Sequence, residues 1–261
     1  MLQPHSFLWH YLWLAPNVLL LLLAFLLWKN DLHKTFPAFF AFALFSAFGE
    51  FGLYIADVVP SVTAQSFWRV DWATLLIEGP LKFLVVAEIF ARVFGSYDSI
   101  VRVGKFLIRA VGISLVLAAA LAAAYGPKSS LFGIVSGAHL LDQTIYLIES
   151  GLLLFIFLLS AYFRLRPAAP VLGIALGLAI SACVHLATWA VIANGGWADS
   201  TRARLDFLNM ATYHVCVLIW FYYLLVPAKV STKAAVPLPE NDLDIWNREL
   251  KRLAQQRMVQ P

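Results

Sequence analysis

Seven long stretches of predominantly apolar residues impose the strongest constraint on how this chain folds. Short segments that hold most of the proline, glycine and charge separate them, and they cover residues 11–28, 37–58, 71–93, 105–125, 137–162, 169–193 and 205–227. A helix of about 20 apolar residues matches the ~30 Å hydrocarbon core of a bilayer. Backbone groups in lipid must be paired within the segment, and none of these stretches alternates as a barrel strand does. The sequence therefore predicts an all-α, polytopic membrane protein, a bundle of seven transmembrane helices.

Composition and charge agree with a membrane protein and predict its orientation. The mean hydropathy is +0.78 and only 13% of the residues are charged, which is far from the composition of a water-soluble domain. Fourteen Lys and Arg residues fall on one predicted side of the membrane and four on the other. The positive-inside rule then places the N-terminus outside and the C-terminus in the cytoplasm, in the plasma (inner) membrane. Trp9, Tyr11 and Trp13 are expected to mark the outer interface of a retained first helix.

The chain is expected to have a membrane domain and a short tail. Residues 1–228 form the predicted seven-helix domain, and residues 229–261 a cytoplasmic tail with one amphipathic helix at about 241–258. That helix carries a narrow apolar stripe and is expected to lie on the inner membrane surface or to dock on a cytoplasmic output partner. The net charge of +4 is explained by topology, and the sequence contains no nucleic-acid-binding motif. The lipid bilayer is therefore the expected partner, and nucleic acid is not.

Three of the predicted helices carry two carboxylates spaced seven residues apart. These pairs are Glu50 with Asp57, Asp71 with Glu78, and Asp142 with Glu149. Seven residues turn a helix through ~700°, so both members of a pair lie on nearly the same face, about 10 Å apart along the axis. An ionised side chain that faces lipid costs ~3 kcal/mol even on the most lenient scale. We therefore expect these faces to line an acidic cavity inside the bundle that is open to the outside.

Depth in the membrane predicts which residues meet in this cavity. Counting from the nearest basic residue on the inner side places Glu50, Glu78, Glu149 and His214 at one level, in the outer half of the bilayer. Other polar side chains follow the same helix faces at helical spacing. The predicted ligand-binding residues are Glu50, Asp57, Glu78, Lys82, Asp142, Tyr146, Glu149, His185, Trp189 and His214.

A divalent metal ion is one candidate occupant of the cavity. Carboxylates with one or two imidazoles suit Zn, Mn or Fe, which makes Glu50, Glu78, Glu149 and His214 a candidate ligand set. The segments CVH (183–185) and HVC (214–216) suggest a Cys2His2 site instead. Residues two apart on a helix point ~200° apart, however, so a Cys and a His from one segment cannot face the same ion. The two cysteines are better interpreted as small buried hydrophobic residues.

Several of these residues have structural interpretations that need no ligand. Asp71 and Asp206 lie near predicted helix starts, where the helix dipole favours a negative charge. Lys82 is one turn from Glu78 and is expected to pair with Glu78 or Glu149, which would form an ion-pair network that fixes helix packing. His185 and His214 are each equally well explained as packing residues. Pro80, which follows Gly79, is expected to kink its helix beside Glu78.

The predicted topology resembles two known seven-helix architectures. Microbial rhodopsins attach retinal to a lysine in the middle of the last helix, but residues 206–226, DFLNMATYHVCVLIWFYYLLV, contain no lysine, so retinal is not expected. The seven-helix zinc hydrolases related to alkaline ceramidases use a His-x-x-x-His pair in the last helix, and this segment has only His214. The resemblance is therefore topological, and it assigns no site residue.

Three classes of function fit the sequence. A receptor-like or sensor-like protein that binds a cation or a cationic small ligand accounts for the topology, the acidic cavity and the cytoplasmic helix. A proton- or cation-coupled transporter accounts for the carboxylates and the Gly-Pro kink, but the sequence has no clear inverted repeat. A metal-dependent intramembrane enzyme accounts for carboxylates and histidine at one depth, but no recognised catalytic signature is present. The first class is the favoured interpretation, and enzyme activity is not expected.

Overall fold

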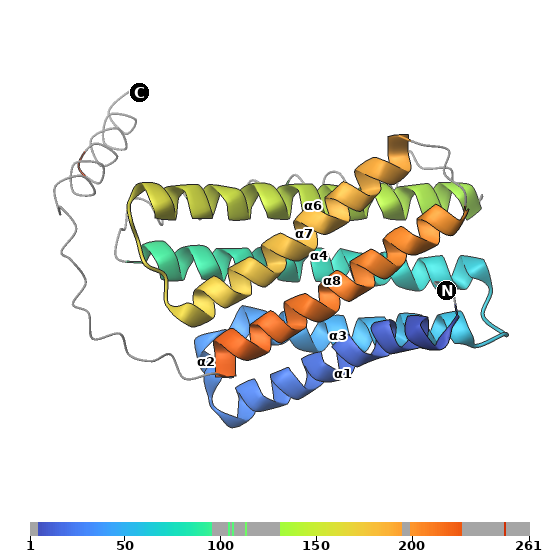
Figure 1. The fold of residues 1–261 in the computed structure, drawn as a ribbon, viewed down its shortest axis with the longest axis horizontal. Coiled ribbons are helices and arrows are strands. Elements are labelled where there is room, and N and C mark those ends of the chain that lie inside the picture. The colour runs from blue at the N-terminus through green and yellow to red at the C-terminus, as the bar shows by residue number, and fades with distance from the viewer. Residues whose placement is uncertain are drawn as a thin grey trace.

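The protein is helical throughout the part of the chain that the computed structural model describes. This part comprises residues 5–95, 104, 106, 113, 131–194, 199–225 and 248, and it contains no strand. Its helices are α1 (Phe7–Lys29), α2 (Leu32–Thr35), α3 (Pro37–Val58), α4 (Ala64–Phe94), α6 (Leu131–Tyr162), α7 (Ala169–Asn194) and α8 (Asp199–Leu225), as drawn in Figure 1. The predicted all-α fold is therefore confirmed for the described residues. The predicted span 105–125 lies outside them, apart from two isolated positions.

Local capping explains where several helices begin. The Ser6 hydroxyl accepts a hydrogen bond from the backbone N–H of Trp9 at the start of α1 (3.3 Å). Thr63 does the same for the N–H of Ser66 at the start of α4 (3.2 Å). Helix α3 has no such side-chain cap from its own N-cap residue. Instead, the Glu88 carboxylate of α4 accepts from the N–H of Phe39 (3.2 Å), which joins the start of α3 to α4.

The six long helices of the described residues pack in a closed ring. Each helix contacts its two neighbours in the order α1, α3, α4, α6, α7, α8, and α8 returns to α1. Helix α1 is therefore opposite α6, and α4 is opposite α8. Figure 1 shows that α1, α4, α6 and α8 all begin at the end of the bundle where the chain starts. We call this end the N-terminal end of the bundle.

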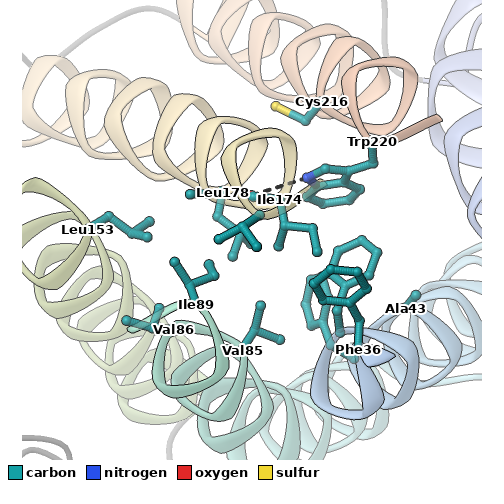
Figure 2. Packing of buried hydrophobic residues seen from close by; sticks show 14 of the residues in the cluster. Phe36, Ala43, Val85, Val86, Ile89, Leu153, Ile174, Leu178, Cys216 and Trp220 are labelled. Atoms are coloured by element: carbon teal, nitrogen blue, oxygen red, sulfur yellow. Dashed lines mark hydrogen bonds between the residues drawn. The ribbon is translucent and has the colours of Figure 1, made fainter. Parts of the chain in front are cut away.

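An apolar core fills the helix ring mainly away from its N-terminal end (Figure 2). Trp220 of α8 is fully buried, and its ring meets Phe39 and Phe42 of α3 edge-on, with centroids 5.3 Å and 6.1 Å apart. Its indole N–H donates to the backbone oxygen of Ile174 in α7 (3.3 Å). Trp220 thus connects three helices, and its contacts close the interior of the ring at this level.

Helices α7 and α8 approach closely because α7 carries glycine at the contact. A Cβ added to Gly177 would overlap the Trp220 indole, and one added to Gly173 would overlap the Tyr223 side chain. We expect Gly177→Ala to lower the free energy of unfolding by roughly 1–3 kcal/mol, because the indole has to move away from Ile174. Gly151→Ala is the matched control, since no atom lies within 4 Å of its added Cβ. Thermal unfolding in detergent measures both, and equal midpoints for the two variants would contradict the close contact.

Among the residues that the structure describes, five helices are long and apolar enough to cross a membrane. They are Phe7–Lys29, Pro37–Val58, Leu141–Tyr162, Ala169–Ile192 and Thr201–Leu225. Large apolar side chains such as Phe25, Phe48 and Leu154 are exposed on these helices, as lipid contact requires. These features indicate a multi-pass membrane protein. The number of spans, the side of each terminus and the tail helix at about 241–258, of which the structure describes only residue 248, stay predictions.

Candidate functional site

A two-lobed cavity lies inside the helix ring, toward the N-terminal end of the bundle. The deep lobe has a volume of about 450 Å³ and reaches down to Phe42, Leu178 and Trp220. The second lobe, of about 530 Å³, reaches Trp68 and Arg202 near the starts of α4 and α8, and we call it the end lobe. The lobes adjoin because they share the lining residues Trp13, Glu50, Glu78, Lys82, Tyr146, His185, Asp206 and Asn209.

The lining of the cavity carries far more acid than base. Among the described residues, the bases with a permanent charge are Lys82 and Arg202, and His185 adds an imidazole. The carboxyl groups are seven, from Glu50, Asp57, Asp71, Glu78, Asp142, Glu149 and Asp206. Asp71 and Asp206 therefore line the cavity. They do not lie at helix starts as expected, because each is the eighth residue of its helix, beyond the first turn where the helix dipole acts. The acidic faces predicted from the seven-residue spacing do meet inside the bundle.

A largely buried ion pair occupies the boundary between the lobes. The Lys82 ammonium lies 3.2 Å from Glu78 Oε1, one helical turn away in α4; the Lys82 side chain is buried and that of Glu78 is 14% exposed. The same ammonium lies 4.1 Å from the centre of the Tyr146 ring of α6, a cation–π contact. Lys82 is therefore paired as predicted, with Glu78, and Tyr146 completes its surroundings.

Glu50 forms a hydrogen bond with Trp13, which was expected at the membrane interface. The indole N–H of Trp13 donates to Glu50 Oε2 at 2.8 Å, so Trp13 points into the cavity. Asn17 lies one turn further along α1 and also lines the deep lobe. The i,i+4 spacing of Trp13 and Asn17 is the sequence signal that reveals this polar face.

A second polar cluster joins α6 to α7 in the end lobe. His185 Nε2 lies 2.8 Å from Asp142 Oδ2 and 2.8 Å from the indole nitrogen of Trp189. The Tyr146 ring stacks on the imidazole with centroids 4.0 Å apart. One imidazole nitrogen either donates or accepts a single hydrogen bond, so it engages Asp142 or Trp189 in a given protonation state. His185 is thus part of the cavity wall, and Tyr146 links its cluster to Lys82.

Three residues that line the deep lobe, Glu149, Asn17 and Asp57, each have a buried oxygen atom without a hydrogen-bond partner within the described part of the chain. Asp57 Oδ2 lies 3.7 Å from His5 Nδ1, so it has an imidazole beside it. Glu149 is 1% exposed, and its Oε2 atom is unpartnered. Asn17 is 3% exposed, and its amide nitrogen donates to the backbone oxygen of Trp13 (2.7 Å). Because that partner is an acceptor, the amide orientation follows, and Oδ1 is left without a donor. Buried polar atoms are almost always paired, so the Glu149 and Asn17 acceptors require an explanation.

His214 does not join the predicted site. It is absent from the described lining of both lobes, and its ring packs near Tyr11 of α1, with centroids 5.8 Å apart. The three glutamates of the candidate metal set line the deep lobe without it. Within the residues that the structure describes, no group of three or more His, Cys, Asp or Glu is placed to hold a metal ion. The cysteines also differ from each other, because Cys216 is buried as expected whereas Cys183 is exposed.

Tyr213 and Asn209 also line the cavity, although they were not singled out from the sequence. The Tyr213 hydroxyl lies 3.3 Å from that of Ser46, which joins α8 to α3 in the deep lobe. Asn209 accepts from the Thr188 hydroxyl (3.1 Å) and lines both lobes. Their signal in the sequence is weak, because an uncharged polar residue in a membrane helix is common at helix contacts.

Fold and cavity together define a class, a multi-pass α-helical membrane protein that encloses an acidic cavity within a ring of helices. Comparisons with protein-family models, with curated proteins and with solved structures find no match for this chain.

Proposed function

We propose that this chain is a receptor-like or sensor-like membrane protein that binds a cation or a cationic small ligand in its acidic cavity. The observation that carries the proposal is Glu149, a fully buried carboxylate that lines the deep lobe with an unpartnered oxygen. Glu50 receives the Trp13 N–H and Glu78 is paired with Lys82, so these two glutamates have partners within the protein. Glu149 is the acceptor that a ligand would satisfy.

Electrostatics supports a positive ligand over a negative one. An isolated buried carboxylate is costly, and the cost falls when a positive charge or a strong hydrogen-bond donor reaches it. An anion would meet a lining whose carboxyl groups greatly outnumber its bases. The predicted orientation puts the N-terminal end of the bundle outside the cell, so the ligand would come from outside, and the cytoplasmic tail would contact an output partner.

A cation-coupled transporter is the alternative, and Pro80 supports it. Proline has no N–H, so the backbone oxygen of Leu76 lacks its usual helical partner directly beside Glu78. Such weakened sites in membrane helices often lie at moving elements and ion sites. The apolar core around Trp220 favours the binding protein, because it closes the ring below the deep lobe.

The proposal predicts opposite effects of Glu149→Gln on folding and on binding. Since Glu149 Oε2 has no hydrogen-bond partner among the described residues, the neutral variant should be as stable as the parent or more stable. Cation binding should be lost in the same variant. The measurement is thermal unfolding of the detergent-purified protein with MgCl2, MnCl2, ZnCl2, phenethylamine hydrochloride or sodium phenylacetate. A cation present at 100 times its Kd should stabilise the parent by about 2.7 kcal/mol.

Glu88→Gln is the matched control, because Glu88 caps α3 and does not line either lobe as described. Without ligand, Glu88→Gln should unfold at a somewhat lower midpoint than the parent. The cation should still raise that midpoint by as much as it does in the parent. Stabilisation by phenylacetate alone would refute the proposal. Uptake of the bound cation into proteoliposomes that carry the parent protein, and its loss in Glu149→Gln, would establish the transporter instead.

A further inference from the structure

We infer that the deep lobe recognises a primary arylalkylammonium, with the ammonium group between Glu149 and Asn17 and the aromatic body on the apolar floor of the lobe. This inference rests on the proposed function and names its ligand class. It goes beyond positive charge, because it specifies both the number of N–H donors and the hydrophobic part of the ligand.

The ammonium head group of the ligand is inferred from two unpartnered acceptors, Glu149 Oε2 and Asn17 Oδ1. Glu149 Oε2 comes from α6 and Asn17 Oδ1 from α1, which are opposite helices of the ring, and both residues line the deep lobe. A primary ammonium has three N–H donors and no acceptor, so it has enough donors for both atoms. A hydroxyl has a single donor, and a quaternary ammonium has none. Lys82 does not fill this role, since its ammonium is engaged by Glu78 and Tyr146.

The aromatic body of the ligand is inferred from the volume of the deep lobe and from the apolar residues at its inner end. A volume of about 450 Å³ is within the range of pockets that bind organic molecules, and a bare ion would leave most of it unfilled. Phe42, Leu178 and Trp220 form an apolar floor, in which the Phe42 and Trp220 rings meet edge-on. An aromatic ring adds to such a cluster through the same edge-to-face geometry.

The oxygen atoms available in the deep lobe favour an ammonium group over a metal ion as the occupant. Divalent transition metals take several protein ligands, and the described residues bring no three acidic, His or Cys side chains into such a group. One carboxylate oxygen and one amide oxygen on opposite helices suit a group that forms separate, directed hydrogen bonds.

The experiment uses a matched set of small probes on the purified full-length protein. Phenethylamine carries both parts of the expected ligand. 2-Phenylethanol keeps the body and replaces the ammonium by a hydroxyl, methylamine keeps only the head, and phenethyltrimethylammonium keeps the charge but has no N–H. Phenethylamine should raise the unfolding midpoint, and calorimetry should give a Kd at least tenfold lower than for each of the other three.

Two variants test the head-group contacts separately from the fold. Asn17→Leu removes one acceptor with little change of volume and should weaken phenethylamine at least fivefold while it leaves methylamine weak. Asn17→Asp keeps an acceptor at that position and adds a charge, so it should bind phenethylamine as tightly as the parent or more tightly. Glu88→Gln, outside the described lining of the cavity, should leave the Kd unchanged.

The possible results separate this inference from the proposed function. If MgCl2, MnCl2 or ZnCl2 stabilises the protein in a Glu149-dependent way and phenethylamine does not, the arylalkylammonium is wrong and the cation-binding function stands. Equal binding of phenethylamine and phenethyltrimethylammonium would likewise refute the N–H recognition alone. Equal binding of phenethylamine and 2-phenylethanol, binding of phenylacetate only, or no shift with any cation would overturn both.

Discussion

Replacing Lys82 with methionine should lower the free energy of unfolding by about 3–5 kcal/mol, the typical cost of breaking a buried ion pair from one side. The Lys82 ammonium is buried between Glu78 Oε1, at 3.2 Å, and the Tyr146 ring, at 4.1 Å from its centre. Methionine fills a similar volume but leaves the largely buried Glu78 carboxylate without its counter-charge. Chemical or thermal unfolding of the purified protein in detergent measures the loss.

A second substitution separates the charge effect from packing. Glu78→Gln combined with Lys82→Met removes both charges and should recover a large part of the loss, because no unpaired charge then remains in the interior. Lys34→Met is the control, since the pair of Lys34 with Asp31 is exposed, and it should leave the midpoint unchanged. A double variant less stable than Lys82→Met would show that methionine disrupts the packing rather than the charge balance.

Replacing Trp220 with alanine should have an effect of similar size, roughly 3–5 kcal/mol. Trp220 is fully buried, contacts Phe39 and Phe42 edge-on, and donates its indole N–H to Ile174 of α7. Alanine leaves a large void where α3, α7 and α8 meet, and it also opens the floor of the deep lobe. The unfolding midpoint should fall, and the affinity for phenethylamine should fall with it.

Trp220→Phe keeps an aromatic ring but removes the indole N–H and part of the ring volume. It should therefore lose less stability than Trp220→Ala, though more than the 0.5–1.5 kcal/mol typical of one hydrogen bond. Trp28→Ala serves as the surface control, because Trp28 is exposed at the end of α1. If Trp28→Ala and Trp220→Ala lowered the midpoint equally, the central role of Trp220 in the core would be wrong.

The helices themselves were largely predictable from the sequence. The predicted span 37–58 has the same bounds as α3, and 11–28 falls within α1. The largest difference is α4, which begins at Ala64 rather than at residue 71. The Thr63 cap starts this helix in a polar segment, and a criterion based on apolar length counts only the part fit for lipid.

The cavity was also predictable in large part, because helical periodicity places each acidic pair on one face. Nine of the ten predicted ligand-binding residues line the lobes, and His214 is the exception. Trp13 was missed as a site residue because an aromatic residue near a helix end has the same sequence signature whether it faces the interface or the interior. Its role depends on the position of Glu50 on a neighbouring helix.

The sequence by itself determines the long apolar stretches and the acidic faces, because both depend on residue spacing within one helix and on the cost of charge in lipid. Which side chains meet depends on the order and the rotation of helices around the ring, which are set by contacts between distant segments. Lys82 was within reach of two glutamates by spacing, and packing placed it on Glu78 and against Tyr146 of α6. His214 shares a depth with the glutamates but faces Tyr11. Depth along a helix is local information, whereas the direction in which a residue faces inside the bundle depends on how the described helices pack against one another.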